Sequence, residues 1–189
     1  MSACSIALVH HPVLDRQGRV ITTAVTSIDL HDLGRSARTY GLERVFVVHP
    51  VAAQRELVDR IQAHWVAGSG ARRIPTREAA LAMLKSVPTL DDVYAELGGR
   101  DAVDVYVTAA RAGDSEPMRY ADARARIARR SKHALILFGT GWGLADSVLE
   151  SADVRLAPIR SERSTYNHLS VRAACAIVLD RLFAAADDR

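Results

Sequence analysis

The chain has 189 residues, of which 49% are hydrophobic and 25% are charged, with a formal net charge of +3. This length is enough for a packed core, and we expect one domain over residues 1–189. The longest apolar runs are far shorter than the ~20 residues of a membrane-spanning helix, and the amino-terminal stretch lacks the pattern of a signal peptide. Cys4 and Cys175 belong to no CxxC pair, which favours a reducing compartment and gives no support to a metal site. We therefore expect a cytoplasmic protein with no metal and no membrane partner.

Hydrophobic patterning predicts strands and helices in alternation along the chain. Strands are expected at 5–10, 45–48, 103–108, 134–138 and 154–159, with a further β-rich stretch at 20–25. Helices are expected from a cap at Ser27 or Asp29 to about Tyr40, and then over 52–66, 76–85 (capped by Thr76), 89–97, 115–130, 145–149 and about 166–185. This alternation is typical of an α/β fold with a mostly parallel sheet flanked by helices.

The stretch Ala134–Leu144 carries the strongest functional signal. Its apolar first half is typical of a strand buried on both faces, and a loop with three glycines in five residues follows it. Glycines permit positive φ and let a ligand lie against main-chain groups. The loops 108–111, 139–143 and 159–170 each follow a strand, so they should meet at the carboxyl edge of the sheet and form a small-molecule pocket. A turn that only reverses the chain is the alternative.

Two nucleotide-binding motifs fit this loop poorly. Its G-x-G-x-G spacing differs from the G-x-G-x-x-G of dinucleotide-binding proteins, and it follows a late strand. No acidic residue stands at a strand end about 20 residues further on to hold a ribose. Arg155 and Arg160 stand there instead. A nicotinamide enzyme is therefore disfavoured, and the lack of a GK[ST] sequence excludes a P-loop.

Three segments together resemble the SPOUT class of RNA methyltransferases: residues 137–144 (LFGTGWGL), Pro158-Ile159, and residues 166–172 (YNHLSVR). More closely, they resemble a small bacterial group related to tRNA guanine methyltransferases, and residues 8–13 and 24–35 extend this over nearly the whole chain. The resemblance implies a C-terminal trefoil knot, in which the last strand and helix thread through a loop. It also implies a homodimer in which the partner completes each active site, S-adenosyl-L-methionine as cofactor, and RNA, either tRNA or rRNA, as substrate.

The resemblance assigns candidate cofactor-binding residues to the three loops. These are Thr108, Ala109 and Ala110 in the first loop, Phe138, Gly139, Thr140, Gly141 and Gly143 in the second, and Ile159, Asn167, His168, Leu169 and Ser170 in the third.

Methyl transfer from a sulfonium requires an aligned nucleophile, help in removing a proton, and exclusion of water. The resemblance links Arg35 to substrate binding or catalysis, and Asp29 stands where the class has an asparagine. Asp29, His31 and His168 are candidate bases. We expect Arg35, Asp29 and His168 beside the transferred methyl group. The alternatives are helix caps for Asp29 and His168, a packed or surface histidine for His31, and a surface arginine for Arg35.

Residues 119–132 are strongly basic. They form either a solvated helix face or a track for RNA phosphates, which would make RNA binding depend on salt. No aromatic set typical of RNA-recognition motifs appears, so any base readout is expected in the active site. Two other functions stay open, namely a non-catalytic protein that senses the cofactor or RNA, and a nucleotide-dependent enzyme of open α/β fold.

Overall fold

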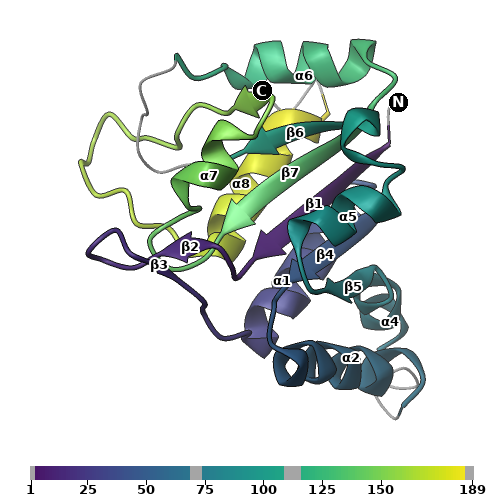
Figure 1. Ribbon diagram of the computed structural model, residues 1–189. Coiled ribbons are helices and arrows are strands. Elements are labelled where there is room, and N and C mark those ends of the chain that lie inside the picture. The colour runs from purple at the N-terminus through teal and green to yellow at the C-terminus, as the bar shows by residue number, and fades with distance from the viewer. Residues whose placement is uncertain (1–2, 69–73, 109–115, 186–189) are drawn as a thin grey trace.

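The computed structural model describes residues 3–68, 74–108 and 116–185, which form a layered α/β structure (Figure 1). The strands are β1 (Cys4–Val9), β2 (Val13–Leu14), β3 (Val20–Ile21), β4 (Arg44–Val48), β5 (Leu84–Val87), β6 (Val103–Val107), β7 (His133–Gly139) and β8 (Val154–Arg155). The helices are α1 (Ser27–Thr39), α2 (Ala52–Val66), α4 (Pro75–Leu81), α5 (Leu90–Glu96), the 3-10 turn η1 (Arg100–Ala102), α6 (Tyr120–Arg129), α7 (Asp146–Glu150) and α8 (Val171–Phe183). None of these helices is long and apolar enough to cross a membrane.

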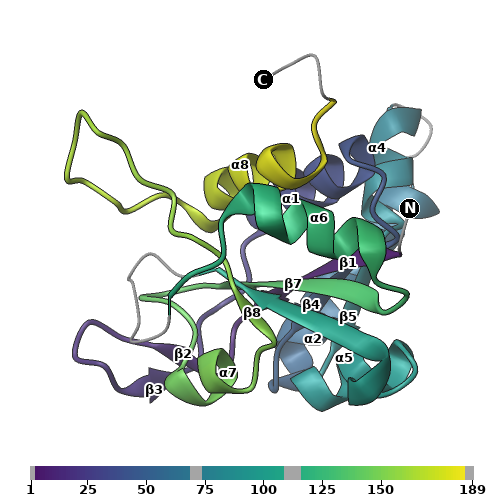
Figure 2. The same cartoon turned by 90° about the horizontal axis from the view of Figure 1, so that it is seen from above.

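Six strands form one parallel sheet in the order β5-β4-β1-β7-β6-β8, and β2 and β3 form a separate antiparallel hairpin. This confirms the predicted fold class. Strand β1 is central and fully buried, because helices cover both faces. Its Ile6 and Leu8 pack with α1, α6 and α8, whereas Ala7 and Val9 pack with α5 and α7 on the other face. Figure 2 shows these two helical layers above and below the sheet.

One predicted helix was wrong in its second half. The helix expected over 76–85 is α4, which ends at Leu81, and Leu84–Val87 forms the edge strand β5. Only Leu84 and Val87 of this strand are buried, so its four residues lack the alternation that identifies a strand. The N-cap is Ile74 and not Thr76.

Other boundaries also moved, and one of them matters for the site. Helix α8 begins at Val171, with Ser170 as its N-cap, instead of near residue 166. Strand β8 ends at Arg155 and β3 ends at Ile21, both earlier than predicted, and α6 begins at Tyr120. Residues 156–170 are therefore a long connection outside regular helix and sheet, which is the form that binding segments often take.

Candidate functional site

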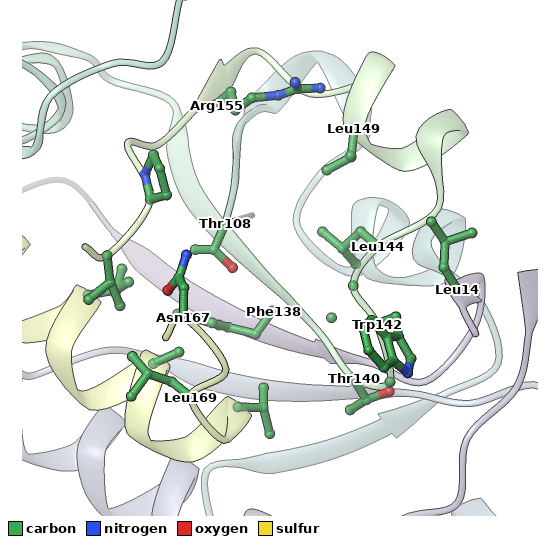
Figure 3. Close-up of a pocket in the computed structure, with 18 of the residues that line it drawn as sticks. Leu14, Thr108, Phe138, Thr140, Trp142, Leu144, Leu149, Arg155, Asn167 and Leu169 are labelled. Carbon is green, nitrogen blue, oxygen red and sulfur yellow. The ribbon is translucent and has the colours of Figure 1, made fainter. Parts of the chain in front are cut away.

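A cavity of about 1710 Å³ lies at the carboxyl ends of β6, β7 and β8 (Figure 3). Thr108 at the start of the first predicted loop, residues 139–143 of the second and part of the third all line it. Every described residue predicted to bind the cofactor lines this cavity: Thr108, Phe138, Gly139, Thr140, Gly141, Gly143, Ile159, Asn167, His168, Leu169 and Ser170. Ala109 and Ala110 lie outside the described residues.

The glycines of the central loop are required by its backbone. At Gly139 a Cβ atom would lie 2.7 Å from the Leu144 nitrogen, which leaves no room for a side chain. Gly141 has φ +60° and a Cβ there would lie 2.8 Å from the Leu14 carbonyl oxygen. Gly143, at φ +113°, has open space around it and needs glycine only for its conformation. The loop thus holds a tight fixed shape against the rest of the cavity wall.

The β2–β3 hairpin supports this loop, and sequence reasoning missed it. The Trp142 N–H donates to the Leu14 carbonyl at 2.9 Å, and the Leu14 N–H donates to the Gly143 carbonyl at 2.9 Å. Leu14 and Thr23 also line the cavity. The only sequence signal was the β-rich stretch after residue 20, which gave no indication of this contact.

A chain of hydrogen bonds links the loop to a buried histidine. The Thr140 hydroxyl donates to the Val9 carbonyl at 3.1 Å, so it accepts from the Thr23 hydroxyl 2.5 Å away. The Thr23 hydroxyl then accepts from Nδ1–H of His10 at 2.9 Å. This assignment leaves Nε2 of His10 unprotonated, and that buried atom has no hydrogen-bond partner among the described residues.

Burial, together with the charge of the neighbouring His49 when protonated, lowers the pKa of His10 to about 4. Burial also lowers the pKa of His49, whose Nε2–H donates to the Thr23 carbonyl while its Nδ1 accepts from the Val51 N–H. Both rings are therefore neutral at pH 7, and each has a defined tautomer.

We expect the free energy of unfolding to fall as the solution is acidified. An unfolded histidine has a pKa near 6.5, so below that pH the unfolded chain binds protons that His10 excludes in the folded state. The contribution of His10 to the free energy of unfolding is thus complete above about pH 6.5 and is lost as the pH approaches 4. Between about pH 8 and about pH 5 the free energy of unfolding should fall by about 2 kcal/mol. Urea titrations across this range test the expectation. A His10→Asn control should show a weaker pH dependence, and equal slopes for both proteins would contradict the assignment.

Asp29 links α1 to the start of α8 at the cavity wall. It is the third residue of α1, and its Oδ2 accepts from the Thr26 hydroxyl at 2.6 Å. That hydroxyl also accepts from the Asp29 backbone N–H at 3.4 Å, so Thr26 and not Ser27 or Asp29 is the helix cap. Oδ1 of Asp29 forms an ion pair with Arg172 at 3.2 Å. Arg172 also reaches Asp32 at 3.5 Å. Asp29 is buried, and both of its oxygens are engaged.

Arg35 does not line the main cavity. It is exposed and borders a second, smaller groove of about 520 Å³ between α1 and the start of α8, with Ser170 and Arg172 on the opposite wall. His31 is also absent from the cavity lining and packs edge-on against the Trp65 ring, with ring centroids 5.2 Å apart. Of the three residues expected beside the methyl group, Asp29 and His168 line the same cavity and Arg35 does not.

His168 lies at the cavity mouth among aromatic rings. Its ring centroid is 5.8 Å from that of Trp142 and 5.3 Å from that of Tyr166. Trp142 was predicted only as part of a glycine loop, and no aromatic set was expected, because Trp142 is distant in the chain from Tyr166 and His168.

The basic stretch is largely structural at its centre. Arg126 of α6 donates two hydrogen bonds to the buried Asp104, at 2.8 Å and 2.7 Å, and the Asp104 carboxylate also accepts from the Tyr106 hydroxyl. Arg124 donates to the Arg181 carbonyl at 2.7 Å near the end of α8. These two arginines therefore fit neither predicted interpretation, since they face protein groups.

Charges around the cavity are mostly negative. Arg155 and Arg172 are the arginines in its described lining. Five carboxylates line it, namely Asp29, Glu116, Asp146, Glu150 and Asp153. Among the residues that the structure describes, no group of three or more histidine, cysteine or acidic side chains could hold a metal ion.

Comparisons with known proteins identify the class. TrmJ from Z. mobilis ZM4 has a TM-score of 0.60 at 17% identity, over 99% of this chain and 70% of that one. The TrmH/SpoU tRNA-modifying enzyme of A. aeolicus has a TM-score of 0.59 at 9% identity, over 99% of this chain and 76% of that one. The fold is therefore that of the SPOUT class of RNA methyltransferases. A family model described as SAM-dependent RNA methyltransferase matches residues 3–184, and the chain belongs to that family.

Curated relatives are more similar in sequence. The tRNA (guanine-N(1)-)-methyltransferase of Nitratidesulfovibrio vulgaris is 42% identical over 179 residues, which is 93% of this chain and 41% of the relative. An uncharacterized protein of Aquifex aeolicus is 36% identical over 181 residues, which is 94% of this chain and 87% of that protein. The chain thus spans about two fifths of the length of the curated tRNA methyltransferases that it matches.

Proposed function

We propose that this chain transfers a methyl group from S-adenosylmethionine to RNA, with the cofactor held by the three loops around the main cavity. The observation that carries the proposal is the convergence of these loops, because all eleven described candidates for cofactor binding line one cavity. tRNA is the first substrate to test, since two relatives are described as tRNA (guanine-N(1)-)-methyltransferases. rRNA is the second.

The chemistry of the cavity fits this cofactor. S-adenosylmethionine carries a sulfonium, an ammonium and one carboxylate, so it is a cation overall. Five carboxylates and two arginines in the lining favour a cationic ligand. Apolar side chains such as Phe138, Leu144 and Ile159 supply the contacts that an adenine ring requires. When bound, the cofactor supplies an electrophilic methyl group.

The candidate catalytic residues take different parts in this proposal. His168 lies at the cavity mouth, where it can accept a proton from an attacking nitrogen or hydroxyl. Asp29 holds Arg172 and the first turn of α1, which fixes the wall beside it. Because both Asp29 oxygens are engaged, His168 is the better candidate for the base.

Arg35 requires a second protomer. It is exposed outside the main cavity of its own chain, so we propose that it enters the active site of the partner in a homodimer. A dimer formed through the region of α1 and α8 agrees with the groove there.

The trefoil knot, the single domain over residues 1–189 and the cytoplasmic location remain predictions.

Calorimetry and methyl incorporation test the proposed function. We expect S-adenosylhomocysteine to bind and NAD and ATP not to bind, and labelled methyl groups to enter bulk tRNA. Binding of NAD or ATP alone would support a nucleotide-dependent enzyme of open α/β fold. Tight binding of S-adenosylhomocysteine, with no methyl transfer to tRNA or rRNA, would support a non-catalytic sensor.

A mixed-dimer experiment tests the place of Arg35. Arg35→Ala and a cofactor-loop variant, Gly141→Val, should each be inactive alone. Random mixing of their subunits should restore roughly a quarter of wild-type activity, because half of the dimers then contain one intact composite site. If mixing restores nothing while mixed dimers form, Arg35 acts within its own chain. Full activity of Arg35→Ala would remove it from the chemistry.

A further inference from the structure

We propose that Trp142, His168 and Tyr166 form a stacking site for an unpaired nucleobase of the RNA substrate. The inference rests on the proposed function, since it names the part of the RNA that reaches the same cavity. The three residues come from two segments, the glycine loop after β7 and the connection before α8.

The rings are arranged edge to face, which leaves aromatic surface open. The interplanar angle is 69° between Trp142 and His168 and 70° between Tyr166 and His168. Trp142 is 49% exposed and Tyr166 is 74% exposed, so two large aromatic side chains present their surface to solvent beside one cavity. Exposed apolar surface that is gathered at one place marks a binding site more often than single scattered residues do.

The structure fixes the backbone of Trp142 beside the cavity. The backbone N–H of Trp142 donates to the Leu14 carbonyl, and Gly141 and Gly143 on either side have positive φ angles that set the course of the chain. Trp142 and His168 both line the cavity, as Figure 3 shows for Trp142. Because the backbone is already fixed, only the two side-chain torsions of Trp142 lose freedom when a planar ligand stacks on its ring.

The charges beside the rings match a nucleic acid. Residues 155–166 carry three arginines, Arg155, Arg160 and Arg163, and one acidic residue, Glu162. Arg160 and Arg163 are exposed and can contact phosphates. The carboxylates inside the cavity repel phosphates, so a base can enter while its backbone stays along the arginine segment.

These features select the class of RNA. Bases of a duplex already stack on one another, and proteins that stack aromatic side chains on RNA bind unpaired bases in loops and single strands. We therefore infer that the substrate presents its target region as a loop or an extruded nucleotide.

Binding assays with a single-stranded RNA of mixed sequence, and with the same RNA annealed to its complement, test this site. The variants are Trp142→Ala, Tyr166→Ala and the ring-preserving Trp142→Phe, with Val51→Ala as the control. Val51 is 49% exposed, as Trp142 is, but lies at the start of α2. Affinity for S-adenosylhomocysteine is measured for each variant. A Trp65→Phe protein keeps Trp142 as its only tryptophan, so its fluorescence reports on stacking.

We expect Trp142→Ala to bind the single strand about 5- to 150-fold more weakly, with little change for the duplex or for S-adenosylhomocysteine. Trp142→Phe and Val51→Ala should bind as the wild type does, and the single strand should quench Trp142 fluorescence. Unchanged RNA binding by both alanine variants, or RNA binding without quenching, would overturn the proposal. An equal loss of affinity for S-adenosylhomocysteine would also overturn it, because the rings would then bind the cofactor. Stacking without any S-adenosylhomocysteine binding would uphold this site while removing the proposed function.

Discussion

A Gly141→Ala variant is expected to lose at least about tenfold in affinity for S-adenosylhomocysteine and to be less stable than the wild type. An alanine at φ +60° costs about 1–2 kcal/mol, and its Cβ would also lie 2.8 Å from the Leu14 carbonyl oxygen. Relief of that contact must move the loop or the hairpin, and both line the cavity. Calorimetry with S-adenosylhomocysteine and thermal unfolding measure the two effects.

Gly41→Ala is the matched control. Gly41 follows α1, has φ +70°, and has open space where a Cβ would stand. This variant should show the cost in stability from its backbone conformation and should leave ligand affinity unchanged. If Gly141→Ala binds S-adenosylhomocysteine as the wild type does, the loop is not the cofactor site.

Arg126→Ala is expected to reduce the free energy of unfolding by about 3–5 kcal/mol. Burial opposes the charge on Asp104, but hydrogen bonds from Arg126 and Tyr106 outweigh it and hold the pKa of Asp104 below its ordinary value. The Asp104 side chain is 3% exposed, so removal of Arg126 leaves a buried carboxylate without its main partner. Urea unfolding at neutral pH measures the loss, which is a large part of the stability of a typical domain.

Arg129→Ala serves as the control on the same helix, because Arg129 is exposed. Its stability should change by less than about 0.5 kcal/mol. Arg126→Lys keeps a charge beside Asp104 and should recover part of the stability, which covers the case in which Arg126→Ala does not fold. Equal stability of the two alanine variants would show that the pair contributes nothing.

Much of the fold could be predicted because the central strands β1, β4, β6 and β7 are mostly apolar. The bounds of α2 match the prediction, and the capping box of Thr89 and Asp92 marks the start of α5 in the sequence as in the structure. The prediction failed at Leu84–Val87, where strand pairing with β4 overrides a continuing helical pattern. It also failed before α8, because the helix begins only after its N-cap Ser170, whose side chain accepts from the Ala173 N–H.

The candidate site, too, could be predicted from the sequence only in part. Loops that follow parallel strands must meet at one edge, so their convergence could be predicted from chain order alone. The contact of Trp142 with Leu14, and that of Trp142 with His168, depend on how distant segments pack, and a single sequence carries no signal for either. The position of Arg35 in the groove between α1 and α8, outside the main cavity, depends on the same packing.

The strand order in the middle of the sheet delays the pairing of β1 during synthesis. Strand β1 precedes the other strands in the chain, yet one of its two neighbours is β7, and the contact between Ser5 and His133 spans 128 residues. While the ribosome is still translating the intervening segments, the flank of β1 that will receive β7 has no native neighbour. Such distant pairing slows folding. The nascent chain therefore exposes an apolar strand edge until β7 has been translated, and a chaperone that shields such edges would assist it.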